Sequence, residues 1–459
     1  MMKQPTLALL FLFVICPLLL SARFRSVEIQ VEQIGPLTVA GYIIVITPPG
    51  VSMTDSFRET LRLDWGDGTS TWVPITNGID ADGDGVLDGE VIESTSLKFI
   101  YAGEHTYTQA GRYLLSMENP NRLGGILNLN FPNSVSIPLV TETEFEVFAN
   151  SSNNHTPVLL EPGGVDFGEI GDPFFHLPNA YDQDDDSLVY ELVTPLMDPG
   201  EPAPNYIELG SIDSDKGIFT YTNTNWGEGD FSIAVQITSY RDGVLQDRMI
   251  RDIMLSYKDE DSTANIAPNI DLDTPLEIIQ EVNIGDTVRF QCLVSDDPDQ
   301  TIRLTATSGL FSYFDNPATF TIEDNTGTFE WIVRDEHARS QPYPVVIKAE
   351  DDFDELGASS FALVRYRVNV GLVNTNEPTV GSWLVYPNPV ANELLIQAPA
   401  FEVELPLRYQ LFNASGQLMR RSIIKSLPGS IEVAGLPTGT YYLQLSTNNQ
   451  RWTERFVKQ

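Results

Sequence analysis

The 459-residue sequence contains only two cysteines, Cys16 and Cys292, and four histidines. Cys16 lies in the apolar N-terminal run described below, so a disulfide between these two cysteines is not expected. The histidines are far apart in the sequence, at positions 105, 155, 176 and 337. The sequence therefore predicts neither a disulfide framework nor a cysteine–histidine zinc site.

Basic residues and long apolar runs are also scarce. Lysine and arginine number 27 against 64 acidic residues, which gives a net charge of −37. Such a chain repels nucleic acid and anionic membranes and attracts divalent cations, although the same acids can simply keep a secreted protein soluble. The one long apolar run, Leu7 to Leu20, follows Lys3 and precedes Ser21-Ala22. Residues 1–22 are therefore expected to be a signal peptide, and no membrane span is expected.

Motifs for common catalytic sites are missing. The sequence has no His-Glu-x-x-His pair, no Gly-x-Ser-x-Gly elbow and no phosphate-binding glycine loop. An enzyme is therefore not expected. Paired carboxylates are abundant, however, so a glycoside hydrolase stays open as a less favoured alternative.

Short apolar runs with period two, bounded by Gly, Pro and Asn, recur along the whole chain. Examples are Val27 to Val31, Leu61 to Trp65 and Gly111 to Met117. No stretch sustains the period of an α-helix, and the length suggests several domains. The fold class predicted is all-β, with tandem Ig-like β-sandwich domains. The predicted boundaries are 26–148, 154–258 and 266–370 for three sandwiches, 371–382 for a linker, and 383–459 for a small C-terminal β-sandwich.

The last module carries the strongest motif set. It begins with Tyr386-Pro387-Asn388-Pro389, has a turn at Asn413 to Gly416, continues through Leu436-Pro437-Thr438-Gly439-Thr440-Tyr441 and ends on a basic, apolar strand. These residues resemble the type A C-terminal sorting domain of the type IX secretion system of Bacteroidetes. The resemblance implies that residues 383–459 engage that secretion machinery. It also implies that the protein reaches the cell surface or the exterior after crossing the outer membrane.

Three short motifs lie within residues 26–148. Asp64-Trp65-Gly66-Asp67-Gly68-Thr69 is followed by His105-Thr106-Tyr107 and then Gly111-Arg112-Tyr113. Glycines permit a tight turn between two strands, and the Asp side chains are expected to cap its amides. The pattern resembles the polycystic-kidney-disease (PKD) repeat, an Ig-like sandwich, with a long insertion between its halves.

That insertion contains closely spaced acids. Its oxygens can surround one hard cation, with Gly85 allowing a sharp turn and Val86 offering its carbonyl. The pattern resembles an EF-hand-type or dockerin-type calcium loop, although Val91 occupies the twelfth position and no helices are expected beside it. A solvated acidic turn is the alternative. The predicted Ca²⁺ ligands are Asp80, Asp82, Asp84, Val86, Asp88 and Glu90.

A second acidic run, Asp182 to Asp186, opens the pattern of the second sandwich, and a later Gly217-Ile218-Phe219-Thr220-Tyr221 run completes it. The third sandwich repeats this plan. The order resembles cadherin-like repeats of bacterial surface proteins. Asp182, Asp184 and Asp186 are spaced to converge on one Ca²⁺, whereas Asp185 is expected to face water. The alternative is again a solvated turn.

The function predicted from these features is a secreted, non-catalytic cell-surface protein, a calcium-stiffened rod for adhesion or ligand binding. A carbohydrate-binding accessory of a polymer-degrading system is the alternative. It would require exposed aromatic side chains in a row, for which Trp65, Trp72, Trp226 and Trp331 are the candidates, although a core position is expected for them.

Overall fold

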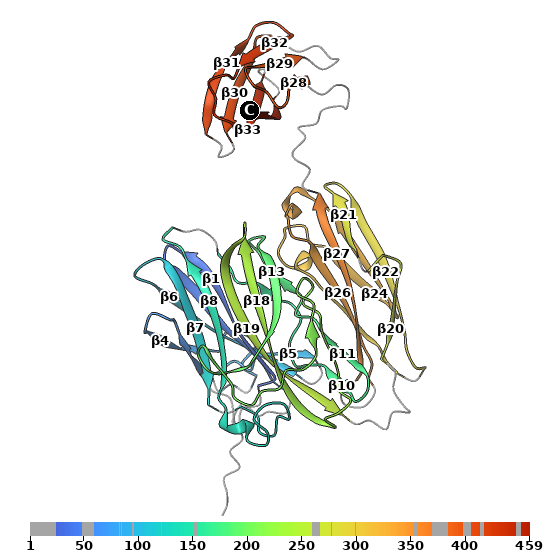
Figure 1. The fold of residues 1–459 in the computed structure, drawn as a ribbon. Coiled ribbons are helices and arrows are strands. Elements are labelled where there is room, and N and C mark those ends of the chain that lie inside the picture. Colours follow the sequence, from blue (N-terminus) through green and yellow to red (C-terminus); the bar gives the residue numbers. More distant parts are fainter. Residues whose placement is uncertain are drawn as a thin grey trace, which may run out of the picture. The chain divides into compact units, whose positions relative to one another are not determined.

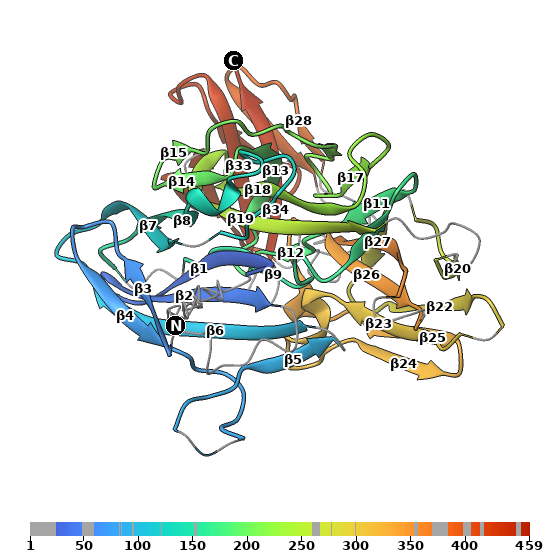
Figure 2. The same cartoon turned by 90° about the horizontal axis from the view of Figure 1, so that it is seen from below.

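The protein is described from a computed structural model. The structure describes residues 24–47, 59–81, 83, 85–93, 96–120, 122–150, 154–258, 267–276, 278–298, 300–352, 357–369, 384–397, 405–413, 417–446 and 451–459. It divides into two compact units, Met1–Asn369 and Val370–Gln459. The described part of the chain is all-β apart from three 3-10 helices, η1 (Ser134–Ser136), η2 (Gly309–Phe311) and η3 (Asp335–His337) (Figure 1 and Figure 2). The predicted fold class is confirmed, whereas residues 1–22 and 371–382 lie outside the described residues.

The first unit consists of three segments: the first (residues 24–150), the second (154–258) and the third (267–369). In the first segment, alternation sets which side chains are buried. Leu61 and Leu63 are buried in β3 (Thr60–Asp64), while Arg62 between them is exposed. The core of this segment is rich in large aromatic side chains, including Trp65, Phe99 and Phe145. Its strands are β1 (Ser26–Gly35), β2 (Thr38–Thr47), β3 (Thr60–Asp64), β4 (Ser70–Pro74), β5 (Glu90–Glu93), β6 (Ser96–Thr106), β7 (Gly111–Asn119) and β8 (Leu139–Val147).

The second segment packs its own core against the long hairpin of β18 (Gly229–Arg241) and β19 (Val244–Lys258). Phe219, Phe231 and Tyr257 are buried in this core. Five of its shorter strands form a three-stranded sheet and a two-stranded sheet. The strands are β9 (Val158–Leu159), β10 (Phe167–Glu169), β11 (Pro173–His176), β12 (Ala180–Tyr181), β13 (Ser187–Val193), β14 (Leu196–Asp198), β15 (Glu201–Pro202), β16 (Ser211–Ile212), β17 (Phe219–Thr222), β18 (Gly229–Arg241) and β19 (Val244–Lys258).

One strand of the second segment also completes the sheet of the first. β19 has 15 residues, which span about 50 Å at ~3.3 Å per residue. Along one edge it pairs in turn with β8, β1 and β10, and β18 occupies its other edge. The first two segments therefore share a 14-stranded sheet with the main order β4-β3-β7-β8-β19-β1-β2-β6-β5. They are joined by backbone hydrogen bonds and not only by the connecting chain.

The third segment is a sandwich of two four-stranded sheets. One has the order β20-β22-β25-β24 and the other the order β21-β27-β26-β23, with β21 parallel to β27. This division is the arrangement of an Ig-like sandwich. Phe290, Trp331 and Tyr366 fill its core, together with the free Cys292. The strands are β20 (Asn269–Leu272), β21 (Ile279–Asn283), β22 (Thr287–Ser295), β23 (Arg303–Thr307), β24 (Thr319–Glu323), β25 (Thr326–Ile332), β26 (Tyr343–Glu350) and β27 (Ser359–Asn369).

The second unit is a small sandwich of a three-stranded and a four-stranded sheet. The Asn388 side chain donates to the carbonyl of Arg455 at 3.1 Å and accepts from the amide of Val457 at 2.9 Å. This motif residue thereby attaches the start of the unit to its last strand. The strands are β28 (Leu384–Tyr386), β29 (Glu393–Gln397), β30 (Leu407–Asn413), β31 (Leu418–Ile424), β32 (Gly429–Glu432), β33 (Gly439–Ser446) and β34 (Arg451–Lys458).

Candidate metal centre at the junction of three segments

The acidic loop of the second segment folds so that three carboxylates converge. The loop connects β12 to β13, and Asp185 adopts a positive φ of 65° in it. The Asp182 Oδ1 atom accepts the amide hydrogens of Asp184 at 2.9 Å and Asp186 at 3.0 Å. One carboxylate oxygen from each of Asp182, Asp184 and Asp186 lies within 4.8 Å of the others. The three carboxylates therefore converge, as their spacing in the sequence predicted.

Two basic side chains from elsewhere in the fold contact this cluster. Arg241, at the end of β18, pairs with Asp186 at 2.7 Å and with Asp184 at 3.2 Å. His155 donates its backbone amide to Asp184 at 2.7 Å, and its Nδ1 lies 3.0 Å from the same carboxylate. The Asp184 hydrogen bond raises the pKa of His155, with burial acting in the opposite direction. Two of the three carboxylates, Asp184 and Asp186, thus have basic side chains as partners.

Asp182 is not compensated in the same way. Its side chain is 1% exposed, and its Oδ2 atom has no hydrogen-bond partner among the described residues. Burial, together with the charges of Asp186 and Asp184, raises the Asp182 pKa to about 7. A buried carboxylate oxygen that lacks a partner is costly to the fold when it is charged. This oxygen is therefore free to serve as a ligand.

A fourth acid lies buried on the neighbouring strand. Asp247 of β19 is fully buried, and its Oδ2 accepts a short hydrogen bond from the Ser239 hydroxyl. Its Oδ1 has no partner among the residues that the structure describes. Burial raises the pKa of Asp247 well above its usual range, and the charge of Asp182 adds to the effect. The negative electrostatic potential of the three carboxylates therefore reaches Asp247 in β19, and it favours a cation near the loop.

The donor set of the loop consists of oxygen atoms. Hard divalent cations prefer such ligands, and Ca²⁺ takes six to eight of them in flexible geometry. The acidic triad could hold a metal ion. Asp182, Asp184 and Asp186 would supply carboxylate oxygens, and backbone carbonyls or water would have to complete the shell. Arg241 competes for two of these carboxylates, so a bound ion would have to share or displace that pairing.

The loop also contacts the third segment. The Asp185 carboxylate accepts the backbone amides of Ser340 at 2.7 Å and Gln341 at 2.8 Å. Arg339 lies 3.2 Å from the same carboxylate, and its guanidinium is 4.7 Å from the centroid of the Tyr181 ring. The expectation that Asp185 faces water was wrong, because Asp185 joins two segments. Sequence spacing could not reveal a partner 155 residues away.

The first segment reaches the same place through the connecting chain. His155 forms an isolated antiparallel bridge with Glu32 of β1, and the Thr156 hydroxyl accepts the amide of Val31 at 3.0 Å. The buried Asn154 side chain donates to the carbonyl of Glu146 at 2.9 Å. The polar chain after residue 153 is therefore packed in place. The acidic cluster lies where all three segments meet.

The acidic loop of the first segment has a different local geometry. Both Asp80 oxygens accept backbone amides, from Gly83 at 2.7 Å and Gly85 at 3.0 Å. Asp88 accepts the amide of Ala81 at 2.8 Å. Asp80 and Asp88 thus cap the turn. Val86 packs against the first core, Glu90 is exposed at the start of β5, and Asp82 and Asp84 lie outside the described residues. A calcium site in this loop stays a prediction.

In the turn of the PKD-like motif, Asp67 caps an amide as predicted, whereas Asp64 pairs with Arg62 at 2.8 Å. Asp67 accepts the amide of Thr69 at 2.9 Å and contacts the His105 ring at 2.8 Å. The Tyr107 hydroxyl donates to the carbonyl of Trp65 at 2.9 Å, and the Trp65 and His105 rings stack with centroids 5.0 Å apart. These contacts give the motif a structural role within the first sandwich.

Comparison with known proteins identifies the second unit. Residues 384–459 match the family described as the secretion system C-terminal sorting domain. This part of the chain is therefore a sorting domain of the type IX secretion system, as the motifs predicted, and it implies export across the outer membrane to the surface or the exterior. Among the described residues no helix is long and apolar enough to cross a membrane. No curated protein matches the chain in sequence.

Several solved structures with tandem immunoglobulin domains are similar at low identity. The insect immune protein hemolin is 11% identical with a TM-score of 0.21, and the match covers 88% of this chain and 96% of hemolin. Immunoglobulin domains 1–5 of Sidekick-1 are 10% identical with a TM-score of 0.17, covering 91% of this chain and 76% of that one. Titin domains A168–A170 are 11% identical with a TM-score of 0.20, covering 64% and 96%. The fold assignment rests on the strand pairing described above.

Proposed function

We propose that this chain is a secreted, non-catalytic surface protein whose residues 24–369 form a calcium-stiffened body for adhesion or ligand binding. The observation that carries the proposal is the buried, unpartnered Oδ2 of Asp182 in a cluster of three carboxylates. The cluster lies where the three segments meet. A bound Ca²⁺ would neutralise the repulsion between these carboxylates and hold the loop that carries Asp185.

Stiffness has two further sources in this body. The shared strand β19 fixes the first segment to the second through backbone hydrogen bonds. Ion pairs fix the second to the third: Lys348 contacts Asp166 at 2.6 Å, and Arg365 contacts Asp215 at 2.6 Å. Because the Lys348 and Asp166 side chains are both nearly buried, we expect that pair to limit movement more than the Arg365 pair, whose Asp215 is exposed.

The absence of catalysis is part of the proposal. Asp182 and Asp186 are each 1% exposed, so a polymeric substrate has little access to the densest carboxylate cluster among the described residues. Asp67, Asp80 and Asp88 are occupied as turn caps. These contacts favour structural roles over general acid–base chemistry for the acids in question.

Calcium binding can be tested by calorimetric titration and thermal melting of the exported chain. At a Ca²⁺ concentration 100 times the dissociation constant, stability should rise by about 2.7 kcal/mol. Asp182→Asn should abolish most of this gain. In chelator, however, the same variant should melt above the wild type, because it removes a buried charge that lacks a partner.

The matched control is the first acidic loop. Asp82→Ala combined with Asp84→Ala should leave the heat of binding at the Asp182 loop intact and remove only a second site, if the first loop also binds. An absence of any calcium-dependent heat, together with identical melting in calcium and in chelator, would contradict the calcium part of the proposal.

Carbohydrate binding is the second candidate function, and one side chain supports it. Trp72 on β4 is 57% exposed, as a sugar-stacking residue must be. Trp65 and Trp331 are buried in two different cores, and Trp226 packs against Phe231. The candidates therefore do not form an exposed row. Binding of the exported chain to a glycan array, lost in Trp72→Ala, would favour this alternative.

A further inference from the structure

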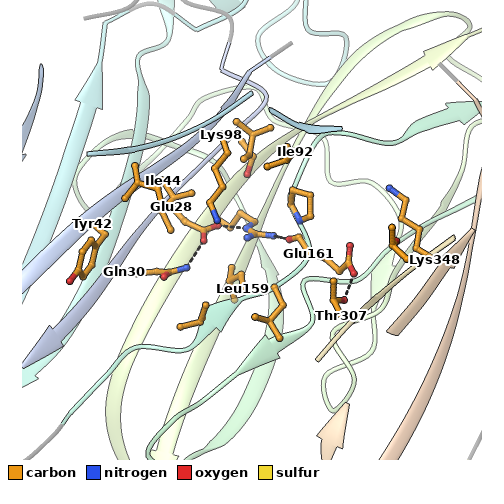
Figure 3. A pocket seen from close by; sticks show the side chains of 18 of the residues that line it. Glu28, Gln30, Tyr42, Ile44, Ile92, Lys98, Leu159, Glu161, Thr307 and Lys348 are labelled. Atoms are coloured by element: carbon orange, nitrogen blue, oxygen red, sulfur yellow. Dashed lines mark hydrogen bonds and ion pairs between the residues drawn. The ribbon is translucent and has the colours of Figure 1, made fainter. Parts of the chain in front are cut away.

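A pocket of about 450 Å³ lies where the first, second and third segments meet. This volume falls within the range typical of small-molecule sites. Figure 3 shows Lys98 and Ile44 from the first segment, Leu159 and Glu161 from the beginning of the second, and Thr307 from the third around the same space. None of the residues that line this pocket belongs to the triad of Asp182, Asp184 and Asp186.

One wall of the pocket is apolar because of strand alternation. Ile43 and Val45 of β2 point into the core of the first sandwich, so Ile44 and Ile46 project from the opposite face of the sheet. Ile44 is paired with Ile100 of β6, which also lines the pocket. An apolar patch on the outer face of a sandwich has to be covered, and here the third segment covers it while leaving a cavity.

The polar side of the pocket contains four basic side chains, and three of them have carboxylate partners. Arg251 forms a short ion pair with Glu28. Arg303 contacts Glu350 at 2.6 Å, and Lys348 contacts Asp166 at 2.6 Å. These three cations are therefore neutralised within the protein. They also hold the wall of the pocket in one arrangement.

Lys98 is the fourth cation, and among the described residues its ammonium group has no ion pair or hydrogen bond. In Figure 3 the side chain extends into the pocket toward Glu28. Glu28 is already engaged, since its two oxygens accept from Gln30 at 2.8 Å and from Arg251. An unpaired ammonium group beside an apolar wall is suited to an anion with an apolar body.

We propose that this pocket binds an amphipathic monocarboxylate, with the apolar chain against the Ile44 and Ile100 wall and the carboxylate on Lys98. The protein as a whole carries a charge of −37, so general electrostatic attraction does not favour such a ligand. Recognition has to come from Lys98 at short range. This inference does not depend on calcium or on adhesion, because none of the lining residues belongs to the acidic loops.

The test is calorimetric titration of the exported chain with decanoate, below the concentration at which it forms micelles. Decanol and decyltrimethylammonium serve as neutral and cationic probes with the same chain length. Decanoate should bind, and decanol and the cation should bind at least about tenfold more weakly, since one charge-assisted contact is worth about 1.4 kcal/mol or more.

Two variants separate the head-group contact from the apolar wall. Lys98→Gln should weaken decanoate about tenfold and leave decanol unchanged, and Lys98→Arg should restore most of the affinity. Ile44→Trp should fill the cavity and prevent binding of decanoate and of decanol. Lys425→Gln, in the second unit, makes the same charge change and should have no effect.

Three results would overturn the proposal: no binding of decanoate to the wild type, equal binding of decanoate and decanol, or unchanged decanoate affinity in Lys98→Gln. Thermal melting of each variant checks that it is folded. Lys98 is only half-buried and has no partner to lose among the described residues, so the Gln variant is expected to melt as the wild type does.

Discussion

At the scale of single residues, several polar side chains are buried in places that apolar neighbours dominate. His176 of β11 is one of them: it is 2% exposed, and its Nε2 has no partner among the described residues. Burial lowers the pKa of His176 to about 3, and the charge of Arg251 acts in the same direction. The ring is therefore neutral in the folded chain at pH values well above 3.

This burial predicts an acid-sensitive step in stability. The unfolded chain binds a proton near pH 6.5 and the folded chain does not until about pH 3, so stability present above pH 6.5 is lost as the pH falls through that window. Between pH 6.5 and 5 the loss should be about 2 kcal/mol. Urea unfolding of the wild type and His176→Gln at both pH values measures this loss. An equal loss of unfolding free energy in the two proteins would contradict the prediction.

Asp185 provides the second residue-scale prediction, because its carboxylate caps two backbone amides of the third segment. Asp185→Asn keeps the shape and tolerates the positive φ, but its amide group can accept only one of the two hydrogen bonds. We expect a loss of about 1–3 kcal/mol, with faster hydrogen exchange at the amides of Ser340 and Gln341. Asp198→Asn, at an exposed position, is the matched control.

At the scale of elements, β19 is the strand on which two segments depend. Its residues pair with β1 and β8 of the first segment and with β18 of the second. A strand that is shared in this way couples the unfolding of both sheets. The boundary expected between residues 148 and 154 marks a connection in the chain, while the sheet continues across it.

The coupling can be measured with Ile253→Ala. Ile253 is fully buried in the core of the second segment and is paired with Ser26 of β1. The cavity should cost about 2–5 kcal/mol, and hydrogen-exchange protection should fall together in β1 and β18. Ile396→Ala, also fully buried, should affect only the second unit. Loss of protection confined to β18 would show that the two segments unfold independently.

The sequence predicted local features well and distant contacts poorly, and the acidic loop shows why. Alternate spacing of Asp182, Asp184 and Asp186 within one tight turn is enough to bring them together. Arg241 and Asp247 join them only because β18 and β19 pair in a particular register. Charged residues inside the apolar pattern of β19 were the available signal, since such residues need buried partners.

At the scale of the whole molecule, the two units carry different tasks. Residues 384–459 form a sorting domain with a core of their own, containing Leu394, Leu411 and Phe456. The first unit contains the acidic cluster and the pocket. The sorting domain therefore lies in the second unit, and binding is proposed for the first. Each can be altered without changing the residues of the other.

This separation predicts the outcome of removing the second unit in cells. A chain that ends at residue 369 should accumulate in the periplasm and fail to cross the outer membrane, because it has lost the sorting domain. Its melting and decanoate binding should match those of the first unit in the full chain, since the core of that unit is untouched. Protease added to intact cells should degrade the full-length surface protein but not the truncated one.

Asn388→Ala refines the same experiment without shortening the chain. It removes the two hydrogen bonds that attach the beginning of the sorting domain to β34, at 3.1 Å and 2.9 Å. Since these bonds are exposed, the second unit should lose only about 1 kcal/mol and remain folded. Asn392→Ala, an exposed substitution in the same unit, is the control. If export of Asn388→Ala falls while that of Asn392→Ala is normal, recognition by the secretion machinery depends on the arrangement of these strands. If both variants are exported as efficiently as the wild type, the Asn388 contact serves stability alone.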